Sequence, residues 1–201
     1  MKRLLIILLA CCFLSAHATD KSMLVLGDSL SAGHGISIDL GWVHLLQQRL
    51  VEQGYSYRVI NASIGGDTTR GAYARLEALL AEAQPDIAVI ELGGNDGLRG
   101  LALDEMFANL AAIIERLIEI DARVLLIPMQ LPPNYGKTYN SGFQNVYQQL
   151  ADSYDVVLSR FILADIADKA GLMQSDGIHP KADAQLMMLE NVWPNLKLLL
   201  E

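Results

Sequence analysis

The chain has 201 residues, of which 52% are apolar, and its formal net charge at pH 7 is −8. This length suits one domain with a sizeable core, and the apolar content excludes an intrinsically disordered chain. An acidic protein repels nucleic-acid phosphates at long range, and no basic cluster follows residue 18. We therefore expect no nucleic-acid partner.

The first 18 residues have the three-part layout of a secretory signal peptide. A basic start, Lys2 and Arg3, precedes an uncharged apolar run over residues 4–14, and Ala16 and Ala18 have the spacing of a signal-peptidase site. The apolar run is too short to cross a bilayer as a helix. We predict a signal peptide at 1–18 and one mature domain at 19–201, in a periplasmic or secreted protein without a stable membrane anchor.

Two alternatives for this segment stay open, an uncleaved anchor and a lipoprotein signal at Cys11. Cleavage after Ala18 would remove both cysteines, Cys11 and Cys12, so the mature chain would have no disulfide, no thiol nucleophile and no thiolate metal site. It would also remove two of the 15 basic residues and none of the 23 acidic ones, which moves the formal charge from −8 to −10.

Strand-like and helix-like stretches alternate along the mature chain. In chain order we predict a strand at 23–26, a helix at 41–52, a strand at 57–60, a helix at 68–83, a strand at 87–92, a helix at 104–120, a strand at 124–129, a helix at 139–154, a strand at 156–158 and a helix at 180–200. Asp104 is predicted to cap its helix, and Pro180 to occupy the first turn of the last helix.

This alternation predicts an α/β fold, a flavodoxin-like three-layer α/β/α arrangement with a five-stranded parallel sheet, because near-continuous apolar strands are covered by helices on both faces. The ligand site of such a sheet lies at the carboxyl ends of its strands. Polar motifs directly after the predicted strands are therefore the candidates for this site.

The first strand runs into the string GDSLS at 27–31, which brings Ser29 to that edge. A serine hydroxyl is a poor nucleophile unless a base takes its proton. Three histidines follow residue 18. His44 lies on a predicted helix and is interpreted as structural or solvent-facing, and His34 lies in a glycine loop and receives no catalytic role.

The third histidine, His179, lies in the string SDGIHP at 175–180, three residues after Asp176. On one turn of chain this spacing puts the two side chains next to each other. A carboxylate that accepts from one ring nitrogen leaves the other nitrogen free to act on Ser29. An alternative reading is that Asp176 caps the last helix.

Acyl transfer also needs hydrogen-bond donors for the developing oxyanion. The string NASIGGD at 61–67 follows the second strand and offers backbone N–H groups, and GGND at 93–96 follows the third strand and offers the Asn95 amide. Each string taken singly is also typical of an ordinary glycine-rich turn.

In combination and in this order, these motifs resemble the SGNH (GDSL) hydrolase superfamily, and within it the bacterial acyl-thioesterase, lysophospholipase and arylesterase group. The resemblance covers nearly all of residues 19–201, including the longer strings at 91–100 and 131–136. It implies that Ser29 is the nucleophile, that Asp176 and His179 complete the triad, and that Ser29, Gly66 and Asn95 form the oxyanion hole. Gly65 stands where close relatives tend to carry a serine.

Other chemistries lack their motifs. The chain has no Gly-x-Ser-x-Gly nucleophile elbow, no phosphate-binding loop and no dinucleotide motif. It also has no His-Glu-x-x-His string and no carboxylate–histidine cluster with ligand spacing, so we expect neither a cofactor nor a metal.

The substrate is expected to be a small acyl ester or lysophospholipid. The loops at 98–103 and 130–136 are apolar and follow the third and fourth strands, so Leu98, Leu131, Pro132 and Tyr135 are predicted to bind an acyl chain. The alternative is that these side chains only cover the edge of the core. Because acyl-CoA is cytoplasmic and this chain is predicted to be exported, we interpret thioester cleavage as an in vitro capability of the same chemistry.

Two other functions are kept as alternatives, a carbohydrate acetyl-esterase of the same superfamily and a non-catalytic, flavodoxin-like binding protein. The protein is expected to be a monomer.

Overall fold

The computed structural model describes residues 21–169 and 171–200. The predicted signal peptide at 1–18, and with it the start of the domain at 19, lies outside the described residues. Within the described residues, no helix combines the length and the apolar character that a membrane span requires.

A five-stranded, all-parallel sheet with the order β2-β1-β3-β4-β5 forms the centre of the fold. Its strands are β1 (Lys21–Gly27), β2 (Tyr57–Asn61), β3 (Ile87–Glu91), β4 (Arg123–Leu126) and β5 (Val157–Leu158). This is the flavodoxin-like strand order, so the predicted fold class is confirmed. The strands β1 and β3 are buried along almost their whole length, as expected for strands with helices on both faces.

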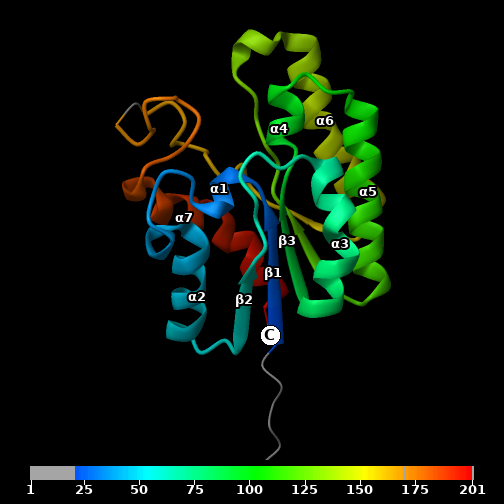
Figure 1. The fold of residues 1–201 in the computed structure, drawn as a ribbon, viewed down its shortest axis with the longest axis vertical. Helices are drawn as coiled ribbons and strands as arrows, with labels where there is room; N and C mark the ends of the chain where they lie inside the picture. The colour runs from blue at the N-terminus through cyan, green and yellow to red at the C-terminus, as the bar shows by residue number, and fades with distance from the viewer. Residues whose placement is uncertain (1–20, 170, 201) are drawn as a thin grey trace, which may run out of the picture.

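Two helical layers cover the sheet (Figure 1). On one face α2 (Trp42–Glu52) packs against α7 (Gln185–Leu196). On the other face α5 (Leu103–Glu119) lies between α3 (Thr69–Ala83) and α6 (Lys137–Ser153). The buried side chains of both layers and of the sheet form one hydrophobic core.

Two predicted helix starts were wrong. The helix α5 begins at Leu103, and its N-cap is Ala102 without a side-chain bond, so Asp104 lies inside the first turn, where a carboxylate favours the helix dipole instead of capping it. Pro180 does not start α7. It pairs with Met173 in an antiparallel bridge, and this pairing keeps the chain extended until a 3₁₀ turn at Ala182–Ala184 leads into α7.

Two short helices at the carboxyl edge were not predicted, α1 (Ser29–Ala32) and α4 (Gly94–Leu98). They follow β1 and β3 directly. The tight turn from β3 into α4 needs Gly93, which has φ +103°, and an added Cβ there would lie 2.3 Å from the Tyr147 hydroxyl and 2.7 Å from the Met106 methyl carbon. The Tyr147 hydroxyl in turn donates to the Leu92 carbonyl at 2.8 Å.

We predict that Gly93→Ala destabilises the fold more than Gly100→Ala. Both glycines have positive φ, which costs an L-residue about 1–2 kcal/mol, but a Cβ at Gly100 (φ +64°) meets nothing within 4 Å. At Gly93 the clash should add about 1–3 kcal/mol. Urea unfolding followed by tryptophan fluorescence measures both losses, and equal losses would show that Tyr147 and Met106 move aside without cost.

Candidate active site

Three segments from distant parts of the chain meet at the carboxyl edge of the sheet. Ser29 is the first residue of α1, directly after β1, and Asn95 lies in α4, directly after β3. β1 and β3 are neighbours at the point where the strand order reverses, which is where ligands bind in open α/β sheets. His179 and Asp176 arrive from the segment that precedes α7.

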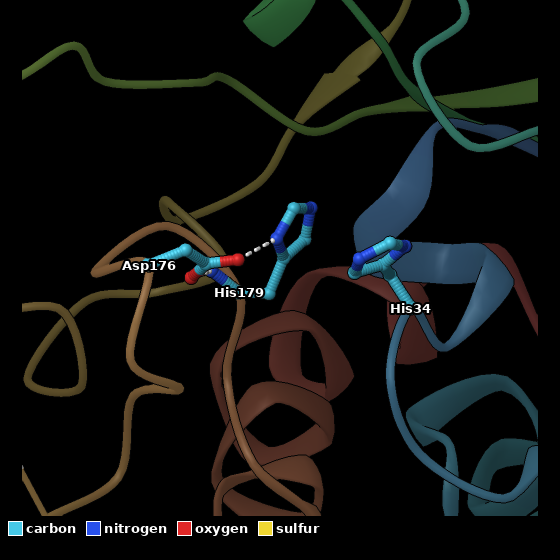
Figure 2. Close-up of side chains that lie close together, drawn as sticks. All are labelled: His34, Asp176 and His179. Atoms are coloured by element: carbon cyan, nitrogen blue, oxygen red, sulfur yellow. Dashed lines mark hydrogen bonds and ion pairs between the residues drawn. The ribbon is translucent and has the colours of Figure 1, made fainter.

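The structure joins Asp176, His179 and Ser29 in one chain of hydrogen bonds. Asp176 Oδ2 lies 2.7 Å from His179 Nδ1, and His179 Nε2 lies 2.8 Å from Ser29 Oγ. Figure 2 shows the carboxylate of Asp176 directed at the His179 ring. The far C-terminal imidazole therefore reaches the N-terminal hydroxyl, as the sequence analysis required.

The segment that carries His179 is fastened by the side chain and backbone of Gln174. The Gln174 N–H donates to the His179 carbonyl at 2.7 Å, beside the bridge between Met173 and Pro180. Gln174 Nε2 donates to the Pro180 carbonyl at 3.0 Å and to the His34 carbonyl at 2.7 Å. One side chain thus ties the loop before α7 to the loop after α1.

Asp176 is held as an anion that faces His179. Its Oδ1 accepts the backbone N–H groups of Ile178 at 2.9 Å and of His179 at 3.0 Å, while Oδ2 faces the ring. The hydrogen bond from the His179 ring and these two N–H groups hold the pKa of Asp176 well below its usual range. The structure does not support the alternative that Asp176 caps the last helix, because α7 starts nine residues later, at Gln185.

Candidate donors for an oxyanion lie around Ser29. The Asn95 amide lines the same cavity as Ser29 and donates to Asp28 Oδ2 at 2.9 Å, which leaves its second hydrogen for a ligand. The 63–67 turn adjoins the serine, since an added Cβ on Gly65 would lie 4.0 Å from Ser29 Cβ. Gly66 has φ +77°, and its carbonyl accepts from Arg99 at 2.8 Å.

Two buried carboxyl groups lie beneath these residues. Asp28 is almost fully buried and caps α1 by accepting the Leu30 N–H at 3.0 Å. Glu91, fully buried at the end of β3, accepts from the Ser31 hydroxyl at 2.7 Å, and that hydroxyl accepts from the indole of Trp42 at 3.2 Å. These bonds fix the helix turn that carries Ser29.

The two carboxyl groups shift each other's ionisation. Burial raises the pKa of Asp28 to about 6, against the lowering effect of the Leu30 N–H, the His179 charge and the Asn95 amide. Burial, and next the Asp28 charge, raise the pKa of Glu91 well above its usual value. A protonated Glu91 relieves the repulsion that two buried anions would create.

The sequence analysis missed Glu91 and the supporting role of Asp28. The available signal for Glu91 was one acidic residue at the end of a fully apolar strand, because a lone buried carboxyl group needs partners. No comparable signal marks Gln174, whose partners are backbone carbonyl groups, one of them that of the distant His34.

His44 and His34 have different surroundings. His44 is exposed on α2, in agreement with its predicted position, and contacts Gln48. The His34 ring, also exposed, stacks on His179 with ring centroids 4.2 Å apart and planes tilted by 35° (Figure 2). The sequence has no carboxylate–histidine cluster with ligand spacing, but the fold brings His34 beside Asp176 and His179, and ligand atoms of the three lie within 4.8 Å of one another.

A cavity of about 720 Å³ opens beside Ser29. Its polar end is formed by Asp28, Ser29, Asn95 and His179. One apolar wall comes from the loops after β3 and β4 and includes Leu98, Met129, Leu131, Pro132 and Pro133. The other wall comes from the segment between β5 and His179, for which no role was predicted. It combines the apolar residues Phe161, Leu163, Ala164, Ala167, Met173 and Ile178 with the carboxylates of Asp165 and Asp168.

Tyr135 is not among the described residues that line this cavity. Its hydroxyl donates to the Leu98 carbonyl at 2.9 Å and so braces the loop that presents Leu98. The lining therefore gives no support to the prediction that Tyr135 contacts an acyl chain, whereas Leu98, Leu131 and Pro132 face the cavity.

Comparisons with known proteins agree with this geometry. The profile of the GDSL-like lipase/acylhydrolase family matches residues 25–185. "Esterase TesA" of Pseudomonas aeruginosa is 50% identical over 192 residues, which cover 96% of each chain. "Thioesterase 1/protease 1/lysophospholipase L1" of Escherichia coli is 42% identical over 168 residues, 84% of this chain and 79% of that protein. A crystal structure of TesA superposes with a TM-score of 0.87 at 51% identity, over 89% of this chain and 99% of that one.

The chain belongs to the GDSL-like lipase/acylhydrolase family, which confirms the resemblance seen in its motifs. Within that family it is an enzyme that hydrolyses ester bonds.

We predict that Glu91→Gln removes a pH dependence of stability. A carboxyl group whose pKa is raised on folding keeps its proton in the folded state while the unfolded chain has lost it above pH 4.5. Its stabilising contribution is fully present below pH 4.5 and is lost as pH rises toward the raised pKa, by at most about 1.4 kcal/mol per pH unit. The free energy of unfolding of the wild type should therefore fall relative to that of Glu91→Gln between pH 5 and pH 8.

Glu77→Gln is the matched control for this measurement. Glu77 is an exposed residue of α3, and its hydrogen bond from Arg116 lowers the pKa of its carboxyl group, so it titrates on the acidic side of this pH range. Its stability difference from the wild type should be flat between pH 5 and pH 8. An equally flat difference for Glu91→Gln would show that Glu91 is ionised in the folded protein.

Proposed function

We propose that Ser29 is the nucleophile, His179 the general base and Asp176 the residue that orients the base. The observation that carries this proposal is the unbroken chain of hydrogen bonds from Asp176 through His179 to Ser29 Oγ, with links of 2.7 and 2.8 Å. In this arrangement the Asp176 carboxylate favours the tautomer that carries hydrogen on Nδ1 and leaves Nε2 free to take the serine proton.

The reaction proceeds in two acyl-transfer steps. Ser29 Oγ attacks the carbonyl carbon of the substrate while the serine proton moves to His179 Nε2. The tetrahedral intermediate then expels the leaving group, which takes this proton from His179. Water then attacks the acyl-serine, with the same imidazole as base. The products are a carboxylic acid and an alcohol or thiol.

The oxyanion is proposed to bind to the backbone N–H groups of Ser29 and Gly66 and to the Asn95 amide. Ser29 starts α1, and the first N–H groups of a helix have no partner inside it. The hydrogen bond from Asn95 to Asp28 holds the amide in the site before the substrate arrives. One such donor typically contributes a factor of about 10²–10³ in rate.

The substrates proposed are carboxylic esters and thioesters of acyl chains, with the acyl chain in the apolar part of the cavity beside Ser29. Relatives that are named an esterase and a thioesterase/lysophospholipase support this class. Leu98, Leu131 and Pro132 form one wall and the segment around Leu163 the other, so the chain would lose water contact on both sides.

The proposal also includes export of the protein. Residues 1–18 are proposed to be a signal peptide and residues 19–201 the mature SGNH hydrolase domain, a monomer in the periplasm or outside the cell. Lysophospholipids and other carboxylic esters occur there, whereas acyl-CoA is cytoplasmic.

We predict that Ser29→Ala lowers kcat for nitrophenyl-ester hydrolysis by about 10⁴-fold or more, because the covalent route is lost. Ser37→Ala, in the exposed segment after α1, is the matched control and should keep the wild-type rate. A fluorophosphonate should label the wild type at Ser29 and leave Ser29→Ala unlabelled. Unchanged hydrolysis in Ser29→Ala would remove this residue from the mechanism and favour a different nucleophile.

We predict that kcat/KM for nitrophenyl esters rises with acyl length until the apolar cavity is filled. A buried methylene contributes about 0.8 kcal/mol, which corresponds to about fourfold in kcat/KM per added carbon. A series from acetate to palmitate measures this slope. Activity confined to the acetyl ester would contradict the acyl-chain proposal and favour the alternative function, a carbohydrate acetyl-esterase.

A further inference from the structure

His34 presents an imidazole to the active site that the proposed reaction does not use. Figure 2 shows its ring beside His179, on the side away from Asp176. One nitrogen of each ring and one carboxylate oxygen of Asp176 all lie within 4.8 Å of one another. Within the described residues, neither ring nitrogen of His34 forms a hydrogen bond.

The position of His34 is fixed by its backbone. Its N–H donates to the Ser29 carbonyl at 3.0 Å, and its carbonyl accepts from Gln174 Nε2 at 2.7 Å. The next residue, Gly35, makes room for this bond, since an added Cβ there would lie 2.4 Å from Gln174 Oε1. The contacts that hold His179 in place therefore also hold His34 next to it.

The donor set of two imidazole nitrogens and one carboxylate oxygen suits a borderline divalent ion. Three protein ligands of these types, with an open fourth position, are typical of Zn²⁺ sites, and imidazole also suits Cu²⁺ and Ni²⁺. Mg²⁺ and Ca²⁺ prefer oxygen ligands alone. We propose that His34, Asp176 and His179 form a binding site for Zn²⁺, and that occupation of this site inhibits the enzyme.

The geometry requires only small side-chain movements. Ligand atoms around a tetrahedral Zn²⁺ ion lie about 3.3 Å from one another, given metal–ligand distances of about 2.0–2.1 Å. Because no two donors lie more than 4.8 Å apart, none has to close by more than about 1.5 Å, and His179 Nδ1 and Asp176 Oδ2, now 2.7 Å apart, would separate slightly if both bound the ion. His34 and Asp176 are exposed, so their side chains rotate without disturbing the core, while the less exposed His179 stays in place.

Inhibition follows from the bonds that His179 already makes. Its Nδ1 faces Asp176 and its Nε2 faces Ser29, so a metal ion on either nitrogen replaces one of these partners. A metal on Nε2 removes the base from Ser29, and a metal on Nδ1 removes the orienting carboxylate. The inhibitory effect rests on the proposed role of His179, whereas the binding of Zn²⁺ does not.

The acidic charge of the protein favours the binding of a cation. The formal charge of −8 attracts cations at long range.

The first test titrates Zn²⁺ against nitrophenyl-ester hydrolysis by the full chain without a polyhistidine tag, each variant being compared with its own metal-free rate. We expect His34→Gln to need at least about tenfold more Zn²⁺ for half-inhibition than the wild type. His44→Gln, which removes an exposed imidazole from α2, should keep the wild-type sensitivity. Mg²⁺ at the same concentrations should leave the rate unchanged. Equal sensitivity of His34→Gln and wild type, absence of inhibition in the wild type, or equal inhibition by Mg²⁺ would each overturn the proposal.

The second test measures Zn²⁺ binding by calorimetry in Ser29→Ala, which keeps all three donors. Adding His34→Gln should weaken binding by at least about tenfold, and adding His44→Gln should not. This comparison separates the two proposals. A Ser29→Ala enzyme that still hydrolyses esters would refute the proposed nucleophile and leave the binding result intact. Zn²⁺ affinity that does not depend on His34 would refute the zinc site and leave the proposed nucleophile intact.

Discussion

The hydrogen bonds of Gln174 hold together two segments that lie near opposite ends of the described chain. They connect the His34 carbonyl after α1 with the His179 and Pro180 carbonyls before α7. The packing of α7 against α2 brings these segments to the same side of the sheet, and the Gln174 contacts then set their spacing. The 2.8 Å contact between His179 and Ser29 depends on both, because neither loop contains a regular element that would position it alone.

A second constraint comes from below the site. Glu91 and Asp28 place two carboxyl groups in the core, where a pair of anions would be costly, and the structure accommodates them by hydrogen bonds and by a raised pKa of Glu91. Through Ser31 and Trp42 this network reaches α2, and through Asn95 it reaches the cavity. The polar core thus connects the turn after β1 with the turn after β3, so that the candidate nucleophile and the candidate oxyanion donor are held by the same buried groups.

The cavity beside Ser29 is the proposed binding site for the acyl chain. One wall comes from the loops of β3 and β4, and the opposite wall from the irregular segment between β5 and His179. Because that segment also carries Gln174, Asp176 and His179, it takes part in both the proposed triad and the lining of the cavity. Loops that are held by a rigid sheet often carry function in this way, and here one loop contributes residues to both the proposed chemistry and the proposed acyl-binding surface.

The sequence by itself determined the class of fold, since five apolar strands that alternate with amphipathic helices have few arrangements other than a parallel sheet between helical layers. It also determined which residues carry the motifs, because Ser29, Asn95, Asp176 and His179 follow strands or form a local pair. The bounds of most elements were predicted to within a few residues. Local signals were sufficient for these features because each depends on neighbours in the chain.

Only the tertiary structure decided the features that depend on distant partners. The bridge between Met173 and Pro180 moves the start of the last helix toward the C-terminus. Gln174 positions the segments of two histidines, and Glu91 accepts a hydrogen bond from Ser31 at the edge of the sheet. His34 becomes a potential ligand only because the fold stacks it on His179. Apart from the bridge between Met173 and Pro180, these contacts join residues that are far apart in the sequence. Neither composition nor periodicity specifies such pairings, because they arise from the packing of whole elements against one another.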